Sequence, residues 1–187
     1  MYRRNKELWL SLLAILLITG IYAFVAWRAS AIPAASGFFG HLLGVLGFIL
    51  MLMTEILYSL RKRSRTARWG RMSDWLQFHI FTGLVGPYMV LLHSSWKFNG
   101  LAGAVTLATL IIVVSGFVGR YIYTLIPRSL EGLEMDATTS PQQEAALVRA
   151  RRLLSLWHAI HIPIGMALFT ASFIHIGAAL YYATLLR

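Results

Sequence analysis

HIFTGLVGPYMVLLH, residues 79–93, and HIPIGMALFTASFIH, residues 161–175, follow one pattern, H-I-x-x-G-x9-H. Each stretch lies inside an apolar segment that is long enough to cross a lipid bilayer as an α-helix. In an α-helix, two residues that are fourteen positions apart are about 21 Å apart along the axis. Their directions around the axis differ by only about 40°. We therefore expect each helix to carry two imidazoles on nearly one face, with one imidazole toward each side of the membrane.

The composition is that of an integral membrane protein. Of the 187 residues, 58% are hydrophobic and 13% are charged, and the mean hydropathy is +0.66, whereas about a quarter of the residues of a soluble domain are charged. The net charge of +10 does not indicate a nucleic-acid partner, because the basic residues gather beside the apolar segments. The absence of cysteine excludes disulfides, thiolate metal sites, iron–sulfur clusters and covalently attached haem.

Five apolar segments have the length of a membrane span, so we expect an all-α integral membrane bundle that forms a single domain over residues 1–187. Spans two to five are expected to form a four-helix core that binds haem. We interpret the first span as a retained anchor, because its apolar run is too long for a signal peptide and has no clear cleavage site. The expected spans are residues 8–27, 37–60, 75–94, 101–126 and 156–182.

The one long connection, residues 127–155, is expected to be a cytoplasmic interfacial segment. Within it the sequence predicts a helix start: Ser140 would be the N-cap and Pro141 the first helical residue. Gln143 stands at the capping-box position. The helix that they begin gathers arginines over residues 149–152. We expect this helix to lie on the membrane surface or to dock a partner.

The distribution of Lys and Arg predicts the orientation. Only Arg28, Lys97 and Arg187 fall on one side of the expected spans, and the other fourteen basic residues lie on the opposite side. The positive-inside rule then places the N-terminus in the cytoplasm and the C-terminus outside. The expected location is a bacterial-type inner (cytoplasmic) membrane, which the chain crosses several times in contact with lipid.

The four repeated histidines are expected to be axial ligands of haem iron. Spans three and five run in the same direction, and their histidines match in depth. His79 and His161 lie near the cytoplasmic side, and His93 and His175 lie near the outer side. Two such bis-imidazole pairs would hold two haem b groups, one above the other, without a covalent bond.

Glycines and one arginine complete the expected cofactor site. Gly83 and Gly165 each follow the inner histidine by about one turn and would leave room for a macrocycle. Gly86, midway between the histidines of its helix, would keep the gap between the haems clear. Arg120 is expected either to meet an inner haem propionate or to reach lipid headgroups. Further polar candidates are Tyr121 and Tyr123 for the inner propionates, and Lys97 and Asn99 for the outer ones.

Other interpretations of the histidines stay open. They would be packing residues if neighbouring hydroxyls satisfied them, or ligands of a di-metal site. Such a site usually recruits carboxylates, and the only clearly intramembrane acid is Glu55. His158 is an alternative to His161, although His158 and His175 lie about 100° apart around the helix. His41 in span two fits a quinone site, a proton-transfer role or simple hydrogen bonding.

The double histidine pattern on spans three and five resembles the ferric reductase-like transmembrane domain and, more widely, di-haem cytochrome b proteins such as the cytochrome b561-like membrane cytochromes. The resemblance covers about residues 37–182. It implies that the four histidines ligate two b haems, which pass single electrons between the membrane faces. Oxidase-type members continue into a sixth span and a flavin and nicotinamide domain, whereas this chain ends at Arg187 and has no G-x-G-x-x-G motif. The expected electron donor is therefore another protein or a membrane quinol.

These observations favour transmembrane electron transfer by a di-haem b cytochrome that serves as the membrane subunit of a larger oxidoreductase system. Electrons would pass between a quinol or a partner protein and an acceptor across the membrane. One alternative is a quinone-reactive cytochrome b anchor of a respiratory dehydrogenase or reductase. Another is a haemless membrane protein that handles metal ions or scaffolds partners.

Overall fold

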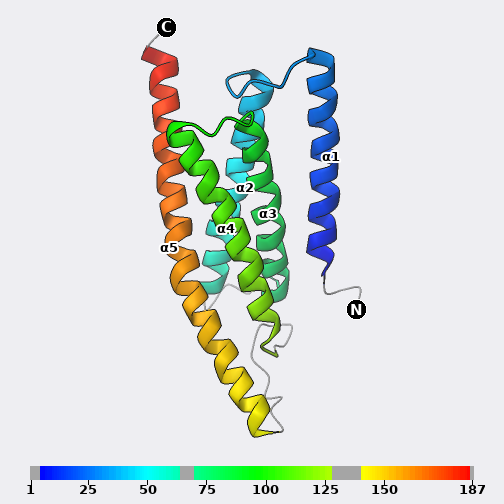
Figure 1. Ribbon diagram of the computed structural model, residues 1–187, viewed down its shortest axis with the longest axis vertical. Helices are drawn as coiled ribbons and strands as arrows, with labels where there is room; N and C mark the ends of the chain where they lie inside the picture. The colour runs from blue at the N-terminus through cyan, green and yellow to red at the C-terminus, as the bar shows by residue number, and fades with distance from the viewer. Residues whose placement is uncertain (1–4, 64–69, 128–139, 186–187) are drawn as a thin grey trace. The chain divides into compact units, whose positions relative to one another are not determined.

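The computed structural model describes residues 5–63, 70–127 and 140–185. Within these ranges the secondary structure is α-helical and contains no strand, which confirms the expected fold class. The helices are shown in Figure 1: α1 (Lys6–Ala29), α2 (Phe38–Arg63), α3 (Met72–His93), α4 (Gly100–Thr124) and α5 (Pro141–Leu185).

All five of these helices are long and apolar enough to cross a membrane, as expected for a multi-pass membrane protein. Large hydrophobic side chains face outward along them. On α1, for example, Leu13 is 66% exposed and Trp27 is 72% exposed. In water such a surface would drive aggregation, but lipid tails are as apolar as these side chains, so the exposed faces suit a bilayer.

The last helix differs from the expectation of a surface helix followed by a separate span. α5 is one continuous helix of 45 residues. Ser140 caps it as expected, because its hydroxyl oxygen accepts the backbone N–H of Gln143 at 3.3 Å. At 1.5 Å per residue the helix is about 67 Å long, roughly twice the thickness of bilayer hydrocarbon. Its first turns therefore extend beyond the hydrocarbon, and residues 128–139 of the expected interfacial segment lie outside the described ranges.

Packing explains why α5 continues without a break. Residues from its first turns, including Ala150 and Leu154, form a buried hydrophobic cluster with Ile122 and Ile126 at the end of α4. Burying apolar side chains against α4 stabilises the helical conformation of this segment even though its sequence is rich in charge. A surface-lying helix would leave these residues in contact with headgroups and water.

The chain divides into two compact units. The first contains α1, α2 and α3, and the second contains α4 and α5. Each unit therefore holds one of the two helices that carry the histidine repeat, α3 or α5, together with the helix that precedes it in the sequence.

In the first unit α3 packs against both α2 and α1 (Figure 1). The core is a cluster of Leu43, Val85, Met89 and Leu92. The backbones of α2 and α3 approach each other closely at Gly47 and Gly86. A Cβ atom added at Gly47 would lie 2.8 Å from the carbonyl oxygen of Gly86, and one added at Gly86 would lie 2.9 Å from that of Gly47. Neither position has room for a side chain, as is typical of closely packed membrane helices.

One added methyl group at Gly47 should force α2 and α3 apart. In Gly47→Ala the new Cβ meets a backbone oxygen that cannot rotate away, so we expect the free energy of unfolding to fall by about 1–3 kcal/mol. Thermal unfolding of the purified protein in detergent, followed by circular dichroism, would show this as a lower Tm. Gly20→Ala is the matched control, because a Cβ at Gly20 would have no atom within 4 Å. Equal Tm values for the two variants would contradict the close packing at Gly47.

Candidate functional site

Both repeated histidines of α3 are hydrogen-bonded to backbone carbonyls of α2. The Nδ1 atom of His79 lies 3.1 Å from the carbonyl oxygen of Thr54. The Nδ1 atom of His93 lies 2.8 Å from the carbonyl oxygen of Gly40. Because a carbonyl can only accept, Nδ1 carries the hydrogen in each ring, and the lone pair of the neutral imidazole is on Nε2. Each ring thus has its Nε2 atom in the form that binds a metal.

These two hydrogen bonds and the glycine contact repeat at equal intervals. Successive contact residues are seven apart along α2 and seven apart, in the opposite direction, along α3. Seven residues are two helical turns to within about 20°, so the three contacts lie along one line between antiparallel helices. Helix α2 therefore holds both imidazoles of α3 in a common register. The contacts are Gly40 with His93, Gly47 with Gly86, and Thr54 with His79.

The His93 ring lies against a glycine of α2. A Cβ atom at Gly44 would be 2.9 Å from both Cγ and Nδ1 of His93, so any side chain there would displace the imidazole. The ring of His41 is also near, with its centroid 6.3 Å from that of His93. His41 is exposed, and its Nδ1 donates to the carbonyl oxygen of Gly37, just before the start of α2, at 3.1 Å. The His93 imidazole is thus positioned by the Gly40 carbonyl and by the absence of a side chain at Gly44.

The His79 ring is supported by an aromatic and a hydroxyl group. The centroid of the Tyr58 ring lies 4.7 Å from that of the His79 ring. Lys62 Nζ in turn lies 6.0 Å from the centroid of the Tyr58 ring. The Thr54 hydroxyl donates to Thr82 Oγ1 at 2.7 Å, and Thr82 is only 1% exposed. The Tyr58 ring thus restricts the imidazole directly, and the hydroxyl bond joins α2 to α3 beside the Thr54 carbonyl that accepts from His79.

The second unit holds His161, the first histidine of its repeat, in a related way. The Nδ1 atom of His161 lies 3.0 Å from the Ser115 hydroxyl oxygen on α4. The Trp157 indole stacks on the His161 ring at 4.5 Å, and its N–H donates to the carbonyl oxygen of Ser115 at 2.7 Å. Gly119 makes space for that indole, because a Cβ there would clash with it. In each unit, then, the preceding helix contacts Nδ1 of the first histidine of the repeat, and an aromatic ring packs on that imidazole. These histidines are His79 and His161.

The other expected site residues have mixed roles. Gly83 and Gly165 have room around them, since an added Cβ would come no closer than 3.5 Å and 4.0 Å to its nearest neighbour. Gly86 is buried against α2, where it serves helix packing, and its expected role beside a gap between haems stays a prediction. Arg120 lies half-buried near the end of α4, and His175 lies half-buried on α5.

The remaining polar candidates lie at helix ends or beside tryptophan. Asn99 is the N-cap of α4, and its carbonyl accepts the Gly103 N–H at 3.1 Å. Lys97 is exposed in the same connection. The His158 ring lies 4.8 Å from that of Trp157, so it shares this indole with His161. His158 thus has a packing contact of its own.

The described ranges contain no group of three or more His, Cys, Asp or Glu residues that could share a metal ion. The pairing of His79 with His161 and of His93 with His175 joins one unit to the other, and it stays a prediction.

The histidines are recognisable in the sequence, whereas the groups that hold them are not. Two of these groups are backbone carbonyls, and the third is the Ser115 hydroxyl. One signal was present: Gly40, Gly44 and Gly47 follow a G-x-x-x-G-x-x-G pattern in span two, which is typical of a close helix contact. That pattern could have indicated which face of α2 meets α3.

Comparison with known proteins finds no family model that matches the chain, no similar curated protein and no similar solved structure. The resemblance to the ferric reductase-like transmembrane domain therefore stays a prediction. Any functional conclusion has to come from the residues of this chain.

The two carbonyl bonds predict the tautomers of the α3 histidines. In metal-free protein labelled with ¹⁵N-histidine, we expect His79 and His93 to carry hydrogen on Nδ1 and a lone pair on Nε2. The imidazole ¹⁵N chemical shifts distinguish the two tautomers, and His79→Gln and His93→Gln assign the signals. The opposite tautomer at either residue would contradict its bond to α2.

Proposed function

We propose that this chain is a di-haem b cytochrome that carries electrons across a membrane as a subunit of a larger redox system. One observation carries the proposal: two imidazoles, fourteen residues apart on a spanning helix, are both hydrogen-bonded through Nδ1 to the neighbouring helix. Metal-ligating histidines usually donate their other ring N–H to such a group, which fixes the tautomer and the ring orientation.

The residues present fit haem b. Histidine is a common axial ligand of haem iron, and a chain without cysteine would have to bind haem non-covalently. The sequence repeat supplies four such histidines, and their matched depths favour His79 with His161 and His93 with His175. Haem, when bound, supplies one-electron oxidation and reduction at its iron.

The contribution of the polypeptide would be orientation, insulation and charge. The carbonyls of Gly40 and Thr54 hold the two imidazoles of α3. The Ser115 hydroxyl contacts the His161 imidazole of α5. The apolar helices keep water away from the ligands. Arg120 remains the proposed partner of an inner propionate, because a guanidinium pairs strongly with a carboxylate.

The proposed orientation follows from the basic residues. With the N-terminus in the cytoplasm of a bacterial-type cell, His79 and His161 lie toward the cytoplasmic side and His93 and His175 toward the outside. Electrons then enter from a quinol or a partner protein and leave to an acceptor on the opposite side.

The haem content tests this proposal directly. Protein purified from haem-replete cells should contain two b haems per chain in a pyridine haemochrome assay, with a low-spin reduced-minus-oxidised spectrum. His93→Ala and His175→Ala should both deplete one spectral component, and His79→Ala and His161→Ala should both deplete the other. His41→Ala and His158→Ala are controls that should keep both components. A colourless preparation would overturn the proposal, and depletion of different components by His93→Ala and His175→Ala would overturn the pairing.

Gly44 should control the position of the outer ligand. The methyl group of Gly44→Ala would lie 2.9 Å from the His93 ring, so we expect the outer haem to be held about 10-fold more weakly. Electron paramagnetic resonance and a redox titration would show a changed outer component beside an unchanged inner one. Gly116→Ala, where a Cβ has no atom within 4 Å, should leave both components unchanged. An unaltered outer signal in Gly44→Ala would contradict the positioning role.

A further inference from the structure

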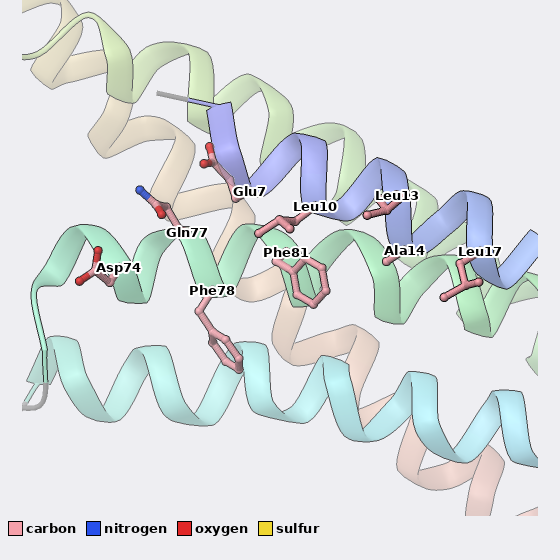
Figure 2. A pocket seen from close by; sticks show the side chains of 9 residues that line it. All are labelled: Glu7, Leu10, Leu13, Ala14, Leu17, Asp74, Gln77, Phe78 and Phe81. Atoms are coloured by element: carbon pink, nitrogen blue, oxygen red, sulfur yellow. The ribbon is translucent and has the colours of Figure 1, made fainter. Parts of the chain in front are cut away.

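A groove of about 550 Å³ runs between α1 and α3 in the first unit. Figure 2 shows that its polar residues gather at one end, near the start of α1, and that leucines of α1 continue along it. The volume lies within the range of small-molecule sites in proteins. Its polar end is lined by Glu7, Asp74 and Gln77, and its apolar part is lined by Leu13, Leu17 and Phe81, among others.

The polar end contains a buried carboxyl group. Glu7 is only 4% exposed, although it lies in the first turn of a spanning helix. Glu7 directly precedes the first expected span, residues 8–27, so its carboxyl group lies where the apolar segment begins. Asp74, half-exposed, pairs with Arg71 through contacts of 3.1 and 3.3 Å, so this ion pair carries no net charge and Glu7 is the remaining acid. The groove thus leads from an acidic, hydrogen-bond-accepting end into an apolar part.

The groove lies close to the inner histidine of α3. Gln77 and Phe78 line it and immediately precede His79 in the sequence. The imidazole of His79 meets α2, whereas Gln77 lines the space against α1. The groove and the imidazole are therefore separated by about the width of one helix, roughly 10 Å.

We propose that this groove binds a lipid-soluble hydroquinone, and the proposal rests on the function proposed above because it names the class of electron donor. A hydroquinone head is neutral and offers two O–H donors, for which carboxylate and amide oxygens of Glu7 and Gln77 are acceptors. Its apolar tail fits along Leu13 and Leu17. A phospholipid would bring an anionic phosphate close to the buried Glu7 carboxyl group, which is electrostatically unfavourable if that group is ionised.

The test measures the binding of decylubiquinol to the full chain in phosphatidylcholine nanodiscs, under anaerobic conditions. Leu13→Trp places a bulky side chain in the groove, and we expect it to weaken binding about 10-fold or more. Leu16→Trp is the matched control, because Leu16 is a similarly exposed leucine of α1 that does not line the groove. Glu7→Gln, which removes the charge and keeps the shape, should weaken binding less. Equal affinity in Leu13→Trp and Leu16→Trp would overturn the proposal.

Two further readouts separate the possible failures. The haem content of the same preparations is measured by pyridine haemochrome. Groove-dependent binding in protein without haem would support the groove and overturn the cytochrome, whereas two b haems without groove-dependent binding would overturn the groove alone. Native mass spectrometry measures bound phosphatidylcholine, and its loss in Leu13→Trp with unchanged decylubiquinol binding would assign the groove to lipid instead.

Discussion

The backbone contact between Gly47 and Gly86 determines how the first unit can work. It sets how closely α2 and α3 approach, and the two histidine bonds lie seven residues to either side of it. Those bonds are 2.8 and 3.1 Å long, near the ordinary range for N–H···O contacts. If side chains held the helices apart, both imidazoles would lose their acceptors at once. A contact without any polar side chain thus supports the polar contacts on which the site depends.

The two units use the same plan with different chemistry. In both, the helix preceding the histidine helix contacts Nδ1 of the inner imidazole, and an aromatic ring packs on that imidazole. A carbonyl fixes one tautomer at His79. The Ser115 hydroxyl at His161 can donate or accept, so it permits either tautomer. His79 and His161 therefore differ in how strictly their protonation is defined.

Hydropathy was sufficient to predict the helices, and periodicity was sufficient to find the histidines. The continuity of α5 was not predictable in this way, because residues before 156 are polar in sequence and become ordered by packing on α4. The carbonyls of Gly40 and Thr54 leave no trace in side-chain chemistry, since every residue carries one. The groove was equally hidden, because it depends on which helix α1 packs against. These features belong to tertiary contacts, whereas the haem pairing is a sequence-based expectation that joins the two units.

The equal seven-residue spacing also limits how the lengths of these helices can change during evolution. A single residue inserted between Gly40 and Gly47 would turn one of them by about 100° around α2 and move the Gly40 carbonyl away from His93. A matched insertion of seven residues in both helices would keep the line of contacts and lengthen it by about 10 Å. Relatives of this chain that span thicker bilayers would therefore differ by whole heptads in both helices, and single-residue insertions and deletions should be confined to the connecting loops.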